Sequence, residues 1–324
     1  MGYPRHSQIS LKETPYYHCV SRCVRRSWLY GYDEYAGKDF SHRKQWIIDR
    51  MSGLVAVFAI EVCAYAVMSN HYHLALFVDT KRAKDWSERE VVRRWTTLHK
   101  KPELVHRYLE TEVSLAEQDA AKVIIETWRQ RLMNISSFMK LMNEYLARKA
   151  NAEDKCTGRF WEGRFKCQAL LDEAAILTAM AYVDLNPIRA GIASTPESSE
   201  FTSIHQRIHV MQGKPSSGPR LRHFHETGNK RDSIPFSLSD YLQLMDWTGR
   251  SIRRDKRGAI DTSLPPILAR LNIDKAAWIE TMQPSGNVFG RAMGKLNHLQ
   301  IHARALGQSW IKGLRQAERM YRHA

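Results

Sequence analysis

A predicted β-hairpin constrains the fold of this chain more than any other feature. Residues 55–67 and His71–Val78 are two apolar runs, separated by a short polar turn. Two such runs around a tight turn predict neighbouring antiparallel strands. Side chains alternate across a strand, so His71 and His73 share one face while Tyr72 points to the other. Two imidazoles on one face can hold one divalent metal ion.

The segments before this hairpin predict the rest of a sheet. Residues 16–30 alternate in part and are rich in aromatic and β-branched side chains, which indicates a first strand. Residues 39–52 carry apolar side chains at helical spacing and predict a helix, with Ser41 as its cap. Strand, helix, strand and hairpin return is the start of a ferredoxin-like fold. The expected class is α+β, with an antiparallel sheet and helices on one face.

Helical periodicity dominates residues 87–151. An apolar stripe at spacings of three and four residues favours core packing over a cofactor site. The stripe comprises Ile125, Trp128, Leu132, Ile135, Met139, Met142 and Leu146. Residues 155–171 break this pattern and suit a short strand, and Asp172 can cap a helix reaching Asn186.

A stretch rich in Pro, Ser and Gly places a domain boundary near residue 200. We therefore expect one domain over residues 1–200, with a helical insertion at about 87–151. Residues 201–324 predict a mainly helical accessory region. Its basic segments suit either DNA binding or a helical cap that stabilises the first domain.

The charge balance favours a polyanionic partner. The chain has 324 residues, 43% of them hydrophobic, and a formal net charge of +15. Nucleic acid is the first expectation. The most apolar stretch, 54–67, is too short to span a bilayer and contains Glu61. The first residues lack the apolar core of a signal peptide, and the five cysteines suit reduced thiols. These features predict a cytoplasmic protein without a membrane partner.

The helix predicted after Asp172 carries the second half of a candidate site. Tyr182 and Asn186 are four residues apart, so they lie on one helical face. If that face packs near His71 and His73, two imidazoles, one amide oxygen and one phenol surround a single point. Such ligands suit Mg²⁺ or Mn²⁺ and leave positions open for substrate oxygens. A tyrosine oxygen there could attack phosphorus and hold a strand covalently.

These residues belong to four segments that resemble one family, the HUH endonucleases. The order and spacing of the segments are most similar to the REP-associated tyrosine transposases among the single-tyrosine members. The matching segments are residues 16–22, 67–73, 158–166 and 181–191. Together the resemblance covers roughly residues 10–195.

The resemblance implies a catalytic domain that cuts and rejoins single-stranded DNA at hairpin-forming repeats. His71 and His73 match the family's metal ligands, and Asn186 matches a third polar ligand. Tyr182 matches the nucleophile, which forms a 5′-phosphotyrosine and frees a 3′-hydroxyl. The implied cofactor is Mg²⁺ or Mn²⁺, and the implied partner is single-stranded or hairpin DNA. A homodimer is compatible with the sequence, and in it the Tyr182 helix could serve the partner's histidines.

Basic residues near these segments are candidate DNA contacts, through phosphate neutralisation. They are Arg22, Arg25, Arg26, Arg159, Arg164 and Lys166. The aromatic residues among them, Phe160, Trp161 and Phe165, have two alternatives: stacking on unpaired bases, or core packing with only the charges outside.

Other functions remain open from the sequence. One alternative is a sequence-specific nucleic-acid binder that keeps the fold without cleavage. Another is an RNA-processing enzyme or a ribose-ring phosphodiesterase, although the paired HxT or HxS motifs of the latter are missing. A second histidine triplet, His223 to His225, lies in the Gly-, Pro- and Ser-rich stretch and is interpreted as a solvated loop.

Overall fold

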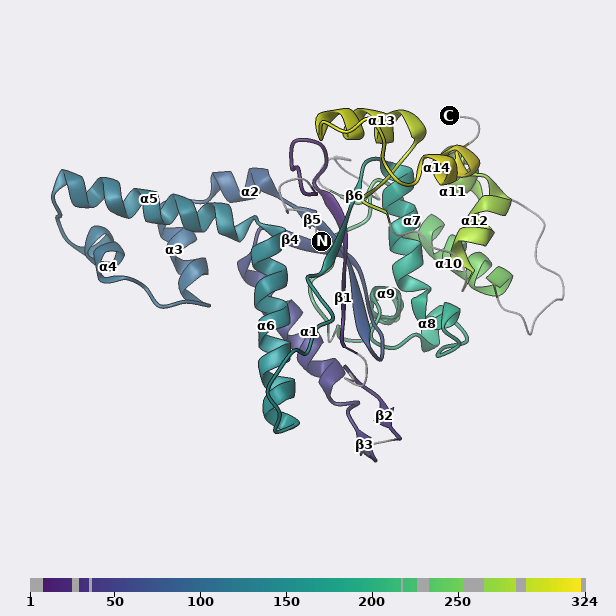
Figure 1. Ribbon diagram of the computed structural model, residues 1–324, viewed down its shortest axis with the longest axis horizontal. Helices are drawn as coiled ribbons and strands as arrows, with labels where there is room; N and C mark the ends of the chain where they lie inside the picture. The colour runs from purple at the N-terminus through teal and green to yellow at the C-terminus, as the bar shows by residue number, and fades with distance from the viewer. Residues whose placement is uncertain are drawn as a thin grey trace.

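The computed structural model describes residues 8–24, 29–34, 37–216, 218–225, 233–252, 265–283 and 290–321 (Figure 1). The strands are β1 (Tyr16–Arg22), β2 (Tyr32–Asp33), β3 (Lys38–Asp39), β4 (Ile60–Val67), β5 (His71–Val78), β6 (Lys166–Leu170) and β7 (Ala292–Met293). The helices of the first two hundred residues are α1 (Arg43–Val57), α2 (Thr80–Asp85), α3 (Glu88–Thr96), α4 (Glu103–Glu110), α5 (Leu115–Leu132), α6 (Ile135–Glu153), α7 (Glu173–Asp184), α8 (Asn186–Arg189) and the 3-10 turn η2 (Pro196–Ser198). The later helices are α9 (Ser203–Met211), α10 (Leu238–Ile252), α11 (Pro266–Arg270), α12 (Lys275–Met282), α13 (Leu296–Ala305) and α14 (Leu314–Met320).

The main sheet has the strand order β4-β5-β1-β6-β7. β1 is antiparallel to β5 and to β6, and β4 is antiparallel to β5, which is the order of a ferredoxin-like sheet. β7 adds a fifth strand, parallel to β6. The α+β ferredoxin-like class expected from the sequence is therefore confirmed, as is a mainly helical C-terminal region.

Helices cover both faces of this sheet. Figure 1 shows α1 and α6 on one side of the strands and α7 with α9 on the other. The hydroxyl of Tyr72 donates to Asn143 of α6 at 2.6 Å, so this face of β5 looks toward α6. The sequence pattern led us to expect helices on one face only, and α7 adds the second layer. The burial of nearly every residue of β4 requires cover on both faces.

Several predicted boundaries differ from the observed ones. The strand predicted from residue 55 begins at Ile60, because the chain stays helical in α1 until Val57. A continuous apolar run does not mark where a buried helix gives way to a buried strand. Ser41 does not cap α1; its hydroxyl bonds Asp39, and the cap position is His42.

The helical insertion comprises α2 to α6. Its helices α3, α4 and α5 extend away from the sheet, whereas α6 returns to pack beside it (Figure 1). The apolar stripe predicted along it is buried throughout and is shared by α5 and α6. The break falls between Leu132 and Ile135, where Asn134 caps α6 through its side chain. The core-packing interpretation of the stripe is confirmed.

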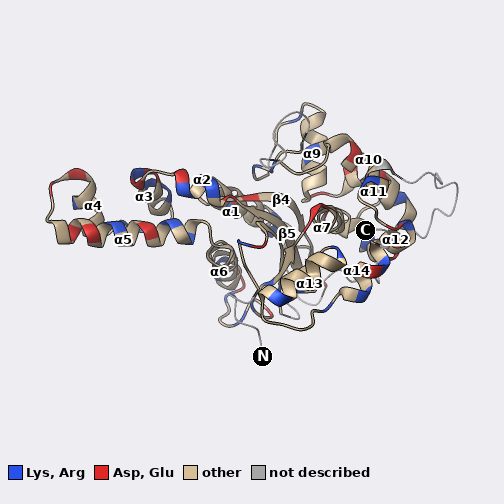
Figure 2. Cartoon of the chain, turned by 90° about the horizontal axis from the view of Figure 1, so that it is seen from above, with Lys and Arg blue, Asp and Glu red and all other residues tan. Residues whose placement is uncertain are grey.

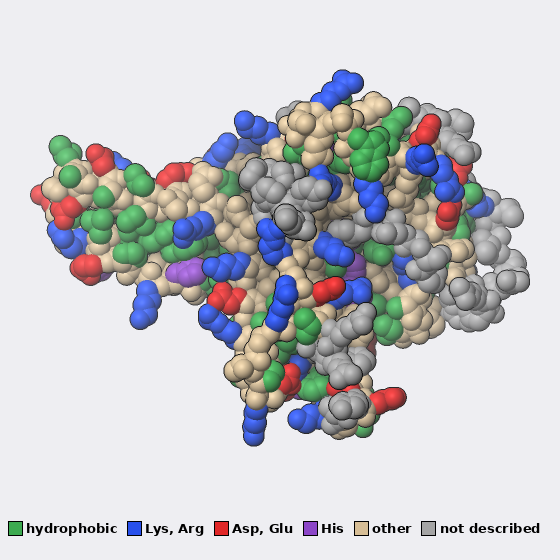
Figure 3. Space-filling view, viewed as in Figure 1, with side chains coloured by type: hydrophobic (Ala, Val, Ile, Leu, Met, Phe, Trp, Pro, Cys, Tyr) green, Lys and Arg blue, Asp and Glu red, His purple; other side chains and the backbone are tan. Residues whose placement is uncertain are grey.

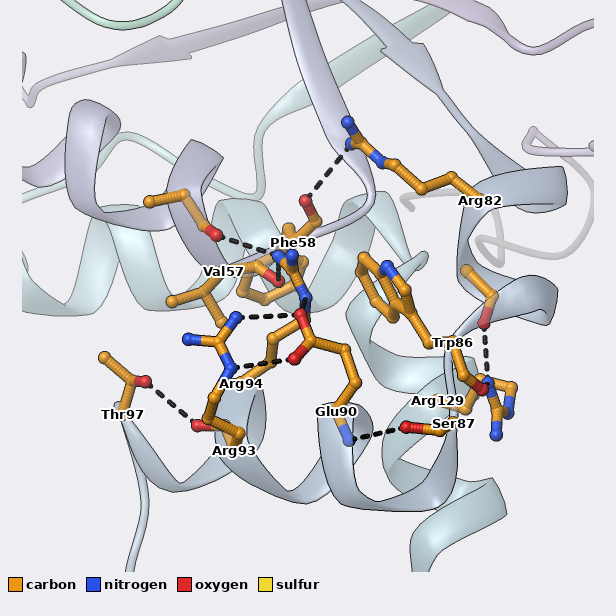
Figure 4. A network of polar contacts seen from close by, with 12 residues as sticks. Val57, Phe58, Arg82, Trp86, Ser87, Glu90, Arg93, Arg94, Thr97 and Arg129 are labelled. Atoms are coloured by element: carbon orange, nitrogen blue, oxygen red, sulfur yellow. Dashed lines mark hydrogen bonds and ion pairs between the residues drawn. The ribbon is translucent and has the colours of Figure 1, made fainter.

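Arginines fix the base of this insertion to the sheet domain (Figure 4). Arg94 of α3 donates to the carbonyl oxygens of Ala56 and Val57, the last residues of α1, at 2.9 and 3.2 Å. Glu90 accepts from Arg94 at 2.7 Å and holds its guanidinium in place. A cation is favourable at a helix C-terminus, where carbonyl groups lack partners. The side chain of Arg94 thus joins α3 to α1.

The C-terminal region packs directly on the sheet domain. Asp172 caps α7 through one oxygen, as predicted, and with the other accepts from the Lys295 backbone at 2.6 Å and contacts His298 at 2.8 Å. At the other end of α7, the hydroxyl of Tyr241 donates to Asp184 at 2.6 Å. The division of the chain near residue 200 stays a prediction.

None of the described helices combines the length and apolar character that a bilayer crossing needs. The five cysteines are free thiols, as expected.

We predict that Arg94→Ala lowers the free energy of unfolding by about 2 kcal/mol, because it removes charged hydrogen bonds from the last two carbonyls of α1, of which the bond to Val57 is partly buried. Arg89→Ala is the matched control on the same helix: Arg89 is 71% exposed, its hydrogen bond to the Leu109 carbonyl is exposed to solvent, and its ion pair with Glu110 measures 3.9 Å. It should cost less than about 0.5 kcal/mol. Urea denaturation of both variants checks this, and equal losses would contradict it.

Candidate active site

β5 presents His71 and His73 side by side on one face of the sheet. Their ring centroids are 4.9 Å apart, with the ring planes at 73°. His73 is buried and His71 half-buried. Tyr72 between them points to the opposite face, as the alternation of a strand requires. The predicted pairing of the two imidazoles on one face is confirmed.

Each of these histidines has its Nδ1 atom engaged. His71 Nδ1 donates to the side-chain oxygen of Asn70 at 2.7 Å, since a carbonyl oxygen only accepts. His73 Nδ1 lies 2.9 Å from Nε2 of His18, a buried residue of β1. A hydrogen bond at Nδ1 orients the ring and leaves Nε2 for a metal ion. The two imidazoles are therefore arranged as metal ligands usually are.

The environment keeps these imidazoles neutral. Burial lowers the pKa of His18 to about 4, partly opposed by a hydrogen bond from Gln168. Burial, with a smaller effect from the Arg22 guanidinium, lowers the pKa of His71 to about 4. The pKa of His73 lies well below its usual value, first through burial and then through its positive and imidazole neighbours. Neutral imidazole is the form that binds metal.

Helix α7 carries Tyr182 to this face of the sheet. Its residues from Ala174 to Ala181 are all buried, and the helix packs on β4, β5 and β6. Tyr182 is half-buried. Its ring meets His73 edge-on with centroids 5.8 Å apart, and His18 at 6.2 Å. One chain thus brings the predicted tyrosine to its own histidines, while a homodimer stays a prediction.

Asn186 lies just after α7, at the first position of α8. It is 8% exposed, and its Nδ2 atom has no hydrogen-bond partner in the described part of the chain. A buried amide donor without a partner is costly and suits a ligand that supplies an acceptor oxygen, such as a phosphate, whereas a metal ion would bind the amide oxygen. Its role as a third metal ligand stays a prediction.

These residues fit a divalent metal ion. Within the described ranges, no group of three or more His, Cys, Asp or Glu side chains is arranged to hold one. A divalent ion would be held by the Nε2 atoms of His71 and His73, by the predicted side-chain oxygen of Asn186 and by substrate oxygens. Such mixed nitrogen and oxygen ligation is compatible with the Mg²⁺ or Mn²⁺ expected from the sequence, and the identity of the ion stays a prediction.

Two residues of the site were not identified from the sequence. His18 supports His73, and Arg189 places its guanidinium 4.0 Å above the ring of Tyr182. Arg189 is buried and also donates to the carbonyl oxygen of Thr281 in α12 at 3.3 Å. The spacing of Tyr182, Asn186 and Arg189, at i, i+4 and i+7, was the available signal for one helical face. Nothing local to His18 indicated its partner.

The predicted DNA contacts that lie among the described residues fall into two groups. Arg22 is the register partner of His71, so its side chain lies on the face that carries the histidines. Lys166 is the register partner of Val20, and Val20 is in turn the partner of His73, so Lys166 lies on the same face. Arg159 and Arg164 are exposed in the segment before β6. Arg25 and Arg26 lie outside the described residues.

The aromatic residues of that segment follow the core alternative. Phe160, Trp161 and Phe165 are 5%, 9% and 8% exposed. The indole nitrogen of Trp161 donates to the Asn143 carbonyl oxygen at 2.8 Å, on the α6 side of the sheet. Stacking of these rings on unpaired bases is therefore wrong for this structure.

We predict that the fold loses stability as pH falls below 6.5, because the unfolded chain then protonates imidazoles that the folded chain keeps neutral. With a folded pKa of about 4, His18 alone should cost roughly 2 kcal/mol at pH 5 relative to pH 8. Denaturant unfolding at both pH values measures the loss. His18→Gln should reduce it by that amount; an identical pH dependence in this variant would contradict the assignment.

Comparisons with known proteins gave one distant structural similarity. No family model and no curated protein sequence matches this chain. One solved structure, described as a REP-associated tyrosine transposase bound to a REP hairpin, is similar over 72% of this chain and 97% of that one. The TM-score is 0.39 and the sequence identity 12%. At that distance, function has to be argued from the side chains of this chain.

Proposed function

We propose that this chain is a metal-dependent endonuclease and strand transferase for single-stranded DNA at hairpin-forming repeats, with Tyr182 as its nucleophile. The observation that carries the proposal is the packing of Tyr182 against His73, 5.8 Å apart, on the face that His73 shares with His71. A phenol beside two neutral imidazoles suits phosphoryl transfer to tyrosine. The resemblance of four sequence segments to REP-associated tyrosine transposases supports the same interpretation.

In this mechanism the phenolic oxygen of Tyr182 attacks a backbone phosphorus. A bond forms between these two atoms, the bond from phosphorus to the 3′ oxygen breaks, and that oxygen takes up a proton as the phenol releases one. The products are a 5′-phosphotyrosine and a free 3′-hydroxyl. Attack by a 3′-hydroxyl on the same phosphorus reverses these bonds and joins the strands. When bound, Mg²⁺ or Mn²⁺ polarises the phosphodiester and neutralises developing charge.

The chain's own residues orient this reaction. Arg189 stacks on the phenol ring at 4.0 Å and restrains Tyr182 in the half-buried position where it meets His73. The positive charges of Arg189 and Arg22 both contribute to the lowered pKa of His73. Two positive charges beside the histidines favour a phosphate group there.

The distribution of charge favours DNA binding over the sheet rather than along the helical insertion. Between residues 102 and 128, the sequence has six acidic and two basic residues, although the chain as a whole is strongly basic. Figure 2 marks the positions of acidic residues along α4 and α5 in red. On the face drawn in Figure 3, Lys and Arg spread over the central body while hydrophobic side chains gather on the insertion. A polyanion is attracted to the body and repelled by this acidic end.

The first test is a covalent adduct. Incubation with Mn²⁺ and a hairpin oligonucleotide labelled 3′ of the cleavage site should give a band that survives denaturation, because the 5′ phosphate stays on Tyr182. Tyr182→Phe should abolish the band. Tyr32→Phe is the matched control, since Tyr32 is 59% exposed in β2, and it should retain the band.

An adduct that persists in Tyr182→Phe would exclude this residue as the nucleophile. Tight hairpin binding with no adduct under any divalent metal would instead support a nucleic-acid binder without cleavage activity.

The second test concerns the metal ligands and uses the protein without DNA. We expect His18→Leu to weaken Mn²⁺ binding by about 10- to 100-fold, because His73 loses the hydrogen bond that orients its ring. His18→Gln can restore that bond and should bind more tightly than His18→Leu. Titration calorimetry measures the affinities, with Tyr182→Phe as a control that should match the wild type. Equal affinity in His18→Leu and the wild type would contradict the supporting role.

A further inference from the structure

A cavity of about 520 Å³ lies beside the candidate active site, between the sheet edge and the C-terminal region. Gln168 of β6 and Thr178 of α7 line it. Both connect it to the site: Gln168 is the register partner of His18 and hydrogen-bonds its ring, and Thr178 stands one helical turn before Tyr182. That turn is about 6 Å along the helix axis, comparable to one or two nucleotides of a stacked strand at roughly 3.4 Å each.

The lining of this cavity combines an apolar wall with a cationic mouth. Leu299 and Met320 are buried against it. Trp310 at the edge is 64% exposed, an unusual position for a large aromatic ring, and Lys312 and Arg315 beside it are exposed. Among the described residues that line the cavity, none is Asp or Glu. The Trp310 ring can stack on a flat aromatic group, and the charges of Lys312 and Arg315 can neutralise phosphates. Together they suit a base carried on a phosphate backbone.

We propose that this cavity receives one unpaired base of the DNA strand next to the phosphate that Tyr182 attacks. The base stacks on Trp310, as single-stranded nucleic acids do on exposed aromatic rings. Lys312 and Arg315 contact the flanking phosphates, and the buried Gln168 amide faces the base edge. The volume is within the range of sites for small aromatic ligands. This inference rests on the proposed function and assigns a substrate contact to the C-terminal region.

The same cavity chemistry could hold a free nucleotide. A base within the strand is favoured because the cavity shares Gln168 with the histidine cluster and lies one helical turn from Tyr182. A base of the bound strand held in this cavity would also position the neighbouring phosphate at Tyr182. The two sources are separated by the experiment.

The test measures binding of a hairpin with a single-stranded flank to the Tyr182→Phe protein, so that cleavage does not interfere. Abasic substitutions scan the flank one position at a time. At one position, the abasic strand should bind about tenfold more weakly. Trp310→Ala should cause the same loss with the intact strand and no further loss with the abasic one. A blunt hairpin of the same stem should bind both proteins equally.

Ile301→Ala and Arg304→Gln serve as surface controls. Ile301 lies on α13, is 57% exposed and is outside the cavity. Ile301→Ala should therefore bind the hairpin like the parent protein. Lys312→Gln should reduce the salt dependence of binding to the flanked hairpin, whereas Arg304→Gln, also on α13, should not.

The outcomes separate this inference from the proposed function. If no abasic position couples to Trp310→Ala, the base-binding role is overturned, whereas an adduct at Tyr182 would still support the enzyme. If deoxynucleoside monophosphates bind the cavity and lose affinity in Trp310→Ala while the flanked hairpin does not, the occupant is a free nucleotide and the strand version is wrong. Failure of the wild-type protein to bind any hairpin overturns both.

Discussion

The packing of α7 on the sheet is the interaction on which the rest of the site depends. A helix buried on all sides needs small residues where it approaches the strands, and Ala174, Ala175, Ala179 and Ala181 supply them. Close approach sets Tyr182 against His73 rather than above a layer of longer side chains. The same approach closes one face of β5, so the imidazoles lose water and stay neutral. Packing and electrostatics thus follow from one contact between helix and sheet.

Much of the fold could be predicted because its signals are local. Alternation in β5 predicted which way His71, Tyr72 and His73 point, and the Asp172 cap predicted where α7 begins. The boundary between α1 and β4 could not be placed, since an apolar run is equally suited to the last turn of a buried helix and to a buried strand. The helices on the second face of the sheet were not predicted either. The burial of β4 on both faces depends on how the whole chain assembles, and the strand's own sequence does not show which segment covers it.

The candidate site divides in the same way. Spacing predicted that Tyr182 and Asn186 share one face, and the structure sets Tyr182 against His73. The position of Asn186 as a ligand stays a prediction. The partnership of His18 with His73 joins residues 55 positions apart, so no periodicity within either strand could reveal it. Arg189 was within reach of a helical-face argument, but its position over Tyr182 also depends on Thr281, almost a hundred residues later. Long-range contacts decide which of several basic residues reaches the site.

The C-terminal region acts on the site through the end of α7. Asp184, two residues after Tyr182, is fully buried, and burial raises its pKa despite donors that favour the charged form. Those donors are the Ser203 hydroxyl, the Ile204 backbone and the Tyr241 hydroxyl, all beyond residue 200. A buried carboxylate deprived of its donors is strongly destabilising. The helix that carries Tyr182 therefore ends at a carboxylate whose hydrogen-bond donors come from residues beyond position 200.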